Sequence, residues 1–355
     1  MNTSSFVVAA AAAAALATAA HAQWTVTLLQ PGISSDSRAT FGGQQGGVIG
    51  NHAVIWNGTA ASWVDFNPTG SSSSVIYGMT AGQQVGSAFS HAGIWTGTAE
   101  SFVDLNPTGA LGSVAYATDG VQQGGSVSFV SGSHAALWTG TADSFVDLNP
   151  GVTNSIVTAV GGGRQVGYTG GPGPGRRAAL WSGTAASYIN LTPTGATRSF
   201  AYGITDDGLR QVGSVTFNVQ LHAGIWTGTA DSFVDIHPAG AVSSNAFAIF
   251  GDYQVGTANI LIPGSIHRPH ASFWNGTADS WVDLQSFLPA EYSSTSQASA
   301  VWSDGVTIYV TGTALNLTTG QNEAVLWTAP VPAPGAAALL GLAGAAAARR
   351  RRTPR

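Results

Sequence analysis

Hydrophobic and polar positions recur along this chain in a unit of about 45 residues. The most regular part of the unit is the pattern His-Ala-x-x-Trp, which occurs at 91–95 and again at 222–226. A tryptophan stands at the same position of all seven units: Trp56, Trp95, Trp138, Trp181, Trp226, Trp274 and Trp327. Neighbouring tryptophans are 39 to 53 residues apart. Such self-similarity indicates a repeat architecture, in which each unit folds as one supersecondary element.

Within each unit, short β-prone runs such as 114–116 alternate with turn sequences such as Asp119-Gly120. A Gln-x-x-Gly segment follows, and its glycine recurs in every unit: Gly47, Gly86, Gly125, Gly167, Gly213, Gly256 and Gly312. No stretch of the repeat region shows a 3.6-residue period over the length of a helix. Each unit therefore predicts four short strands, which is the size of one β-propeller blade.

The two ends of the repeat region are complementary. Residues 24–32 match the fourth strand of a unit, by comparison with 233–238, and lack the three strands before it. The last unit ends in its third strand at 325–327 and lacks a fourth. The N-terminal strand therefore completes the last blade and closes a ring. We predict an all-β fold, a seven-bladed β-propeller of four-stranded blades over residues 23–329, with an open β-solenoid as the alternative.

Residues 1–22 have the pattern of a secretory signal peptide. The segment 6–20 is almost entirely apolar, and Ala20 and Ala22 place small residues before a cleavage site. Gln23 is then the first residue of the mature chain. A buried alanine-rich helix is the alternative interpretation of this segment.

Residues 330–355 predict a second targeting segment. A short proline motif leads into an apolar run at 336–348, for which we predict a helix, and a cluster of arginines follows. The motif and the cluster consist of Val331, Pro332, Pro334, Gly335, Arg349, Arg350, Arg351 and Arg352. This arrangement resembles the PEP-CTERM sorting signal of exosortase-processed bacterial surface proteins. The resemblance implies export to the cell surface or extracellular space, transient membrane anchoring through the helix, and an exosortase-like processing enzyme as partner.

The repeat unit itself resembles the HAF-type extracellular repeat. The matching features are the His-Ala-x-x-Trp pattern, the Asp-Leu that follows it and the Gln-x-x-Gly strand, and together they cover residues 24–328. The resemblance implies an extracellular β-propeller. It assigns no activity, because one scaffold can carry many different functions.

Composition restricts the chemistry that the chain can perform. The 355 residues include no cysteine, which excludes disulfides, thiolate metal sites and cysteine nucleophiles. All 12 basic residues are arginine, and five of them lie in the last seven residues. The rest of the chain carries seven arginines against 17 acidic residues. So acidic a body repels nucleic acid, whose binding requires the neutralisation of phosphates.

One polar pair recurs, a histidine before the tryptophan and an aspartate nine residues after it. The pairs are His52 with Asp65, His91 with Asp104, His134 with Asp147, His222 with Asp235, and His270 with Asp283, replaced by Arg177 with Asn190 in the fourth unit. If the hairpin turns at 97–98, His91 faces Asp104. Gly93 then faces Phe102, which sets a large ring over a small residue. Because an enzyme needs one asymmetric site, recurrence favours structural hydrogen bonding over metal binding or catalysis. We therefore predict no metal and no cofactor.

Three segments depart from the repeat and are candidate binding loops: 169–177, 259–270 and 287–297. The first adds glycines, prolines and two arginines to an otherwise acidic body. Binding residues concentrate on loops over rigid scaffolds, and neutral drift of exposed loops is the alternative. The carboxylates outside the repeat and turn positions are Asp252, Glu291 and Glu323.

These observations lead to three functional hypotheses. The first, which we expect, is a non-enzymatic exported propeller that serves as an interaction or polysaccharide-associated scaffold in the cell envelope or extracellular matrix. The second is a secreted propeller enzyme, a polysaccharide lyase or glycosidase. Such an enzyme needs two carboxylates, or a His/Tyr/Arg group, converging at one end of the central channel. The third is a structural coat component without a small ligand.

Overall fold

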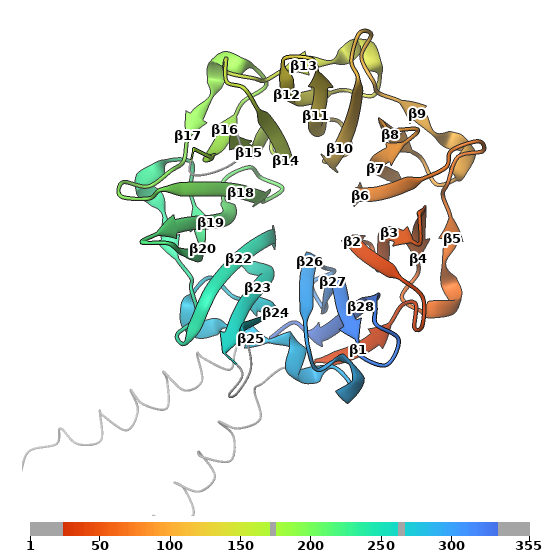
Figure 1. The fold of residues 1–355 in the computed structure, drawn as a ribbon, viewed down its shortest axis with the longest axis vertical. Helices are drawn as coiled ribbons and strands as arrows, with labels where there is room; N and C mark the ends of the chain where they lie inside the picture. The colour runs from red at the N-terminus through yellow and green to blue at the C-terminus, as the bar shows by residue number, and fades with distance from the viewer. Residues whose placement is uncertain (1–23, 171–174, 262–266, 333–355) are drawn as a thin grey trace, which may run out of the picture.

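The computed structural model describes residues 24–170, 175–261 and 267–332. These residues form seven four-stranded antiparallel sheets that are arranged as the blades of a ring (Figure 1). The predicted seven-bladed β-propeller is confirmed. The described residues contain no α-helix, only eight short 3-10 helical turns.

Blades 1 to 7 follow chain order, and each is described from its innermost strand outward. The innermost strands are β2 (Ser35–Phe41), β6 (Ser74–Thr80), β10 (Gly112–Thr118), β14 (Ser155–Gly161), β18 (Arg198–Ile204), β22 (Ala241–Phe250) and β26 (Ser296–Ser303). The second strands are β3 (Gln44–Ile49), β7 (Gln83–Ala88), β11 (Gln123–Phe129), β15 (Arg164–Thr169), β19 (Gln211–Phe217), β23 (Tyr253–Leu261) and β27 (Thr307–Asn316).

The outer half of each blade contains the His-Ala-x-x-Trp pattern. The third strands are β4 (His52–Trp56), β8 (His91–Trp95), β12 (Gly132–Trp138), β16 (Arg177–Trp181), β20 (Gln220–Trp226), β24 (His267–Trp274) and β28 (Gln321–Pro330). The outermost strands are β5 (Val64–Asp65), β9 (Val103–Asp104), β13 (Val146–Asp147), β17 (Ile189–Asn190), β21 (Val234–Asp235), β25 (Val282–Asp283) and β1 (Thr25–Leu28).

Helical turns connect the third strand to the outermost strand in six blades. They are η1 (Ala60–Ser62), η2 (Ala99–Ser101), η3 (Ala142–Ser144), η4 (Ala185–Ser187), η5 (Ala230–Ser232) and η6 (Ala278–Ser280). Two more, η7 (Leu284–Phe287) and η8 (Ala290–Tyr292), lie between β25 and β26. They belong to the predicted insertion 287–297 and to the residues just before it.

The ring closes through the N-terminal strand, as predicted. Strand β1 pairs antiparallel with β28, with Val26 opposite Trp327. The first residues of the propeller therefore supply the outermost strand of blade 7, next to β28 in Figure 1. This pairing joins the two ends of the described chain and excludes the open solenoid.

The repeat tryptophans lie in the core, and all seven are fully buried. Trp138, at the end of β12, belongs to one cluster with Val85 and Leu105 of blade 2 and Val127 of its own blade. Aromatic side chains bury more apolar surface than other types, so one tryptophan per unit links neighbouring blades. The repeated tryptophan therefore determines the packing between neighbouring blades as well as the structure of each sheet.

The targeting segments fall largely outside the described residues. The signal pattern at 1–22, the apolar run at 336–348, and the residues Pro334, Gly335 and Arg349–Arg352 all lie outside them. The predicted C-terminal helix is therefore not among the described elements. Val331 is described and donates its backbone N–H to Val306 O at 2.7 Å. Within 24–170, 175–261 and 267–332, no helix has the length and apolar character needed to cross a membrane.

Candidate functional site

Each innermost strand carries a bulge at the same position. In blade 2, Ile76 pairs with Gly86 and Gly78 pairs with Val85, so Tyr77 is an extra residue without a partner in β7. The seven residues at this position are Arg38, Tyr77, Tyr116, Thr158, Tyr202, Phe247 and Ser299. A bulge re-aims the side chain at which it occurs.

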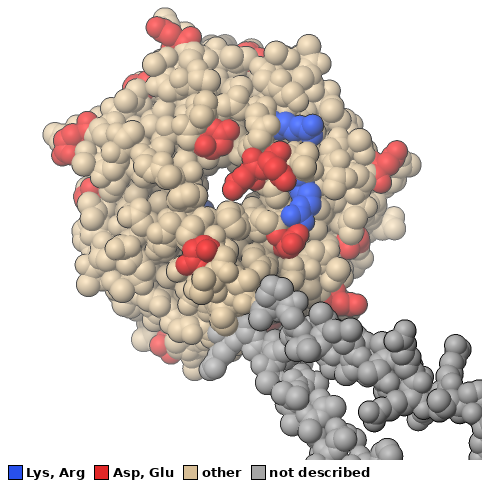
Figure 2. Space-filling view, turned by 180° about the vertical axis from the view of Figure 1, so that it is seen from behind, with Lys and Arg blue, Asp and Glu red and all other residues tan. Residues whose placement is uncertain are grey.

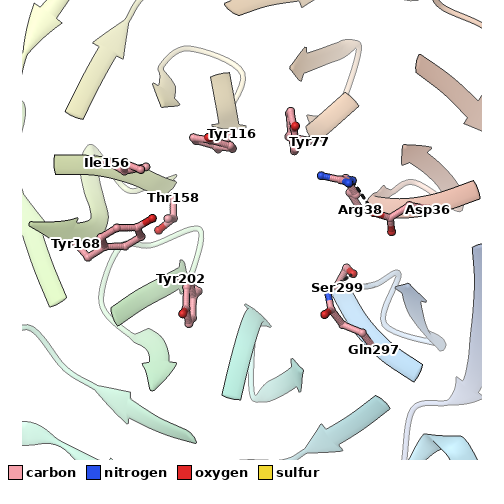
Figure 3. Close-up of a pocket in the computed structure, with 10 residues that line it drawn as sticks. All are labelled: Asp36, Arg38, Tyr77, Tyr116, Ile156, Thr158, Tyr168, Tyr202, Gln297 and Ser299. Atoms are coloured by element: carbon pink, nitrogen blue, oxygen red, sulfur yellow. Dashed lines mark hydrogen bonds and ion pairs between the residues drawn. The ribbon is translucent and has the colours of Figure 1, made fainter. Parts of the chain in front are cut away.

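Six of these seven residues line a cavity of about 440 Å³ in the central channel. Figure 3 shows Arg38, Tyr77, Tyr116 and Tyr202 arranged around this cavity from four different blades. Side chains two residues earlier lie on the same face of each strand and also contribute, as Asp36 and Gln297 do. The cavity therefore lies toward the end of the channel where the innermost strands begin. We call it the aromatic mouth.

On one side of the aromatic mouth, a cation and two aromatic rings are in contact. The guanidinium carbon of Arg38 lies 4.9 Å from the centroid of the Tyr77 ring. Tyr77 in turn meets Tyr116 edge to face at 5.2 Å. Arg38 Nε lies 2.7 Å from Asp36 Oδ2, and this ion pair is drawn in Figure 3. Burial raises the pKa of Asp36 and the neighbouring Arg38 opposes the rise. The negative charge of the Asp36 carboxylate offsets the positive charge of Arg38.

On the other side, Phe200 stands at the centre of an aromatic cluster. Its ring stacks on Tyr202 at 5.5 Å and meets Tyr168 edge to face at 5.2 Å. Tyr202 also contacts Phe247 at 5.4 Å. Burial raises the pKa of Tyr202 to about 12. This hydroxyl therefore stays protonated at ordinary pH and is a neutral hydrogen-bonding group.

The opposite end of the channel has different chemistry. Asp119 and Asp206 line a cavity of about 470 Å³ there, together with Phe250 and Trp302. Burial raises the pKa of Asp206, and the negative charges of Asp207 and Asp119 add to the rise. Figure 2 shows acidic side chains, with basic ones among them, around the central opening on the face turned away from the viewer in Figure 1. The cavity at one end of the channel is thus lined mainly by tyrosines, and the cavity at the other end carries two aspartates.

The recurring histidine–aspartate pairs are hydrogen-bonded in all five blades that contain them. The Nδ1–Oδ2 distances lie between 2.7 and 2.9 Å. The second carboxylate oxygen accepts a backbone N–H two residues further on, as Asp104 Oδ1 does from Asn106 at 2.7 Å. Each aspartate thus ties the third strand to the start of the next connection. None of these pairs lines the aromatic mouth.

The predicted register of this hairpin is wrong by two residues. Gly93, not His91, pairs with Asp104, and Ile94 pairs with Val103. The hairpin contains η2, in which Ser101 Oγ accepts from Thr96 N at 2.8 Å, so its turn is displaced from 97–98. His91 reaches Asp104 diagonally. The predicted contact of Gly93 with the Phe102 ring is confirmed, because a Cβ on Gly93 would lie 1.9 Å from that ring.

Two blades replace the pair. In blade 4, Arg177 donates to Thr197 O at 2.7 Å and Asn190 Oδ1 accepts from Thr192 N at 2.9 Å. In blade 7, Glu323 takes the place of the histidine, four residues before Trp327. Glu323 is therefore a repeat position, contrary to the prediction that it lies outside the repeat.

The three carboxylates singled out from the sequence are not brought together. Asp252 is exposed and forms an ion pair with Arg210 at 2.7 Å. Glu291 is exposed, and Glu323 is fully buried. None of the three lines either end cavity of the channel. Within the described ranges, no group of three or more His, Asp or Glu side chains is placed to hold a metal ion.

The candidate loops differ in what they contribute. The segment 169–177 includes Arg176, whose guanidinium carbon lies 5.0 Å from the centroid of the Tyr168 ring in the aromatic mouth. The segment 287–297 ends in Gln297, which lines the same cavity. The described part of 259–270 extends the pairing of β23 with β24 from His270 to His267. Two of the three candidate loops therefore reach the site.

No protein-family model and no curated protein matches the chain. Similar solved structures include a puromycin hydrolase at 9% identity and a TM-score of 0.56, covering 81% of this chain and 53% of that one. An acylaminoacyl peptidase from Pyrococcus horikoshii is 11% identical with a TM-score of 0.51, and the match covers 87% of this chain and 54% of that one. The β-propeller domain of the Trilobed protease from Pyrococcus furiosus is 10% identical with a TM-score of 0.50, and the match covers 83% of this chain and 95% of that one. The chain thus spans about half the length of the first two proteins.

These similarities correct one expectation from the sequence. The expectation that the protein is not an enzyme is contradicted, because the similar propellers occur in a hydrolase, a peptidase and a protease. At 9 to 11% identity the likeness establishes the fold alone, so no reaction follows from it. The comparisons show that the chain is a β-propeller.

Proposed function

We propose that this protein is an exported surface propeller that binds a polysaccharide of the cell envelope or extracellular matrix at its aromatic mouth. The observation that carries the proposal is the convergence of Tyr77, Tyr116 and Tyr202 with Arg38 around one cavity. Sugar rings offer apolar C–H faces that pack on aromatic rings, and hydroxyl groups that bond to polar side chains. Asp36, the tyrosine hydroxyls and Gln297 supply such polar groups.

Export is supported by the two ends of the chain. The apolar segment at 1–22 resembles a signal peptide, and the residues at 330–355 resemble the sorting signal that an exosortase-like enzyme would process. The test is the intact mass of the native protein from membrane and medium fractions. We expect a chain that begins at Gln23 and ends before Arg349. A full-length chain in the cytoplasm would contradict export.

Polysaccharide binding is tested with the exported protein on an array of bacterial envelope and matrix glycans. We expect Tyr77→Ala and Tyr202→Ala to weaken binding by about tenfold, because each removes an aromatic face from the cavity. Trp63→Ala is the matched control, since Trp63 is exposed and does not line the aromatic mouth. Glycan binding that survives both tyrosine substitutions would show that the mouth is not the binding site.

A polysaccharide lyase is the second candidate. The observation that favours it is that tyrosine and arginine side chains converge on the same cavity, since this chemistry needs a proton acceptor and a cation beside the sugar. Asp36 is the one carboxylate among the described residues that line this cavity, so a glycosidase lacks its usual pair. Incubation with each bound glycan decides between binding and lysis. Unsaturated sugar products, followed by ultraviolet absorbance, would support the lyase.

A further inference from the structure

Two arginines beside the aromatic mouth have aromatic partners and no acidic one. Arg176 and Arg198 place their guanidinium carbons 5.5 and 5.3 Å from the centroid of the same ring, that of Phe200. No carboxylate of the described residues lies within ion-pair distance of either side chain. The Nε atoms of both are buried and lack a hydrogen-bond partner among the described residues.

What distinguishes these two arginines is that they share one aromatic ring within an acidic body. The chain outside its last seven residues carries 17 acidic residues against seven arginines, so carboxylate partners are abundant. Arg38 and Arg210 each have one, Asp36 and Asp252. Both arginines are half-buried, with the Nε atom of each withdrawn from water, and a cation–π contact contributes only about 0.5–2 kcal/mol. Neither Arg176 nor Arg198 has a carboxylate partner among the described residues, so both side chains can bind an anion.

The pair is continuous with the aromatic mouth. Tyr168 lines the cavity and lies 5.0 Å from the guanidinium carbon of Arg176. Phe200, which contacts both arginines, stacks on Tyr202 in the wall of the same cavity. A ligand seated among the tyrosines therefore extends toward Arg176 and Arg198. The segment 169–177 supplies the first arginine and the start of β18 supplies the second.

We propose that Arg176 and Arg198 bind the carboxylate of an acidic sugar residue, so that the polysaccharide taken by the aromatic mouth is a uronate-containing one. The inference rests on the proposed function and names its substrate class. The guanidinium group is planar and presents its N–H donors in a fork that matches the two oxygens of a carboxylate. Stacking on Phe200 holds both forks in place before the ligand arrives, which lowers the entropic cost of binding.

The test compares uronate oligosaccharides with their methyl esters, which keep the sugar rings and remove the charge. We expect the exported protein to bind the free acids about tenfold more tightly than the esters. The double variant Arg176→Gln/Arg198→Gln should bind both forms with the affinity that the unaltered protein shows for the ester. Arg164→Gln is the control for the loss of an arginine charge, because Arg164 does not line the aromatic mouth.

Two results would overturn the inference while leaving the proposed function intact. One is equal binding of acid and ester by the unaltered protein, a comparison that needs no variant. The other is a preference for the acid that persists in the folded double variant. If no glycan on the array binds, the proposed function fails and this inference fails with it. Thermal unfolding of each variant shows whether it is folded.

Discussion

Gly86 lies directly against the backbone carbonyl of Val75. A Cβ atom on Gly86 would be 1.9 Å from that oxygen, which no side chain can occupy. The same contact, between 1.8 and 2.0 Å, occurs at every recurring glycine: Gly47, Gly86, Gly125, Gly167, Gly213, Gly256 and Gly312. Each of these glycines pairs with the residue just before a bulge of the innermost strand, as Gly86 does before Tyr77. The glycine thus makes room for the bulge that aims a side chain into the channel.

Substitution of this glycine tests that relationship. We expect Gly86→Ala to lower the free energy of unfolding by about 3 kcal/mol, because backbone rather than a side chain must move to accept the methyl group. Gly175→Ala is the control, since a methyl group at Gly175 would point into open space and the change should stay within about 0.5 kcal/mol. Urea unfolding measures both. An equal effect of the two substitutions would mean that the bulge relaxes freely.

The blade number could be predicted because the same residues recur in every unit, and the ring closure because the two ends of the repeat region complement each other. Trp138 and its equivalents recur at one position, and each is buried for the same reason, the packing of one blade on the next. The strand at 25–28 could be assigned because blade 7 lacks its outermost strand without it. Features that every unit repeats can be read from one sequence, since the copies serve as independent examples.

The aromatic mouth could not be predicted, because its residues differ from blade to blade. The bulge position is occupied by Arg38, Tyr77 and Thr158 in three blades. A search for residues that are identical in every unit does not detect such a position. A signal nevertheless exists. In five of the seven units this residue lies nine positions before the recurring glycine. The predicted register of the hairpin was wrong because the sequence around Gly97 does not reveal that η2 lies within the connection.

The closure of the ring depends on Glu323 as well as on β1. Its carboxylate accepts from Gly32 N at 2.9 Å and from Asn316 Nδ2 at 3.1 Å, and it also bonds to the Tyr292 hydroxyl. We expect Glu323→Ala to lower the free energy of unfolding by about 3 kcal/mol, because several buried donors lose their acceptor. Glu291→Ala, at an exposed neighbouring carboxylate, should have an effect within about 0.5 kcal/mol.

The same contact has a spectroscopic signature. Burial, with the hydrogen bond and charge of Glu323, raises the pKa of Tyr292 to about 12. In Glu323→Gln the charge is gone, so the pKa of Tyr292 should fall toward its ordinary value. Ultraviolet titration of the tyrosines, compared with a Tyr292→Phe variant, measures this pKa. An unchanged titration in Glu323→Gln would show that burial alone determines it.

Blade 5 contains a pH-sensitive variation of the repeat. His237 Nδ1 lies 2.7 Å from Ser244 Oγ, in the place where Asn106 Oδ1 accepts from Ser113 in blade 2. Burial lowers the pKa of His237, and the stacked ring of His222, 4.2 Å away, adds to the shift. The unfolded chain therefore binds a proton more readily than the folded one, so this contribution to stability is lost as pH falls through the unfolded value of about 6.5.

Replacement of His237 by the residue of the other blades tests this linkage. His237→Asn keeps an acceptor for Ser244 and removes the titrating group. We expect the loss of stability between pH 8 and pH 5.5 to be smaller in the variant than in the unaltered protein, by urea unfolding at both values. An identical pH dependence would show that His237 does not contribute.

The tip of the hairpin between β19 and β20 carries backbone strain that can be relieved. Val219 has φ of 69° and its side chain is 94% exposed, so a β-branched residue occupies the left-handed region without burying its surface. That conformation costs about 1–2 kcal/mol for residues other than glycine. We expect Val219→Gly to raise the free energy of unfolding by about 1 kcal/mol, after the added entropy of glycine in the unfolded chain. Val130→Gly is the control, because Val130 is equally exposed at the tip between β11 and β12 and keeps φ outside the left-handed region. It should lower stability slightly, and a similar decrease in both variants would contradict strain at Val219.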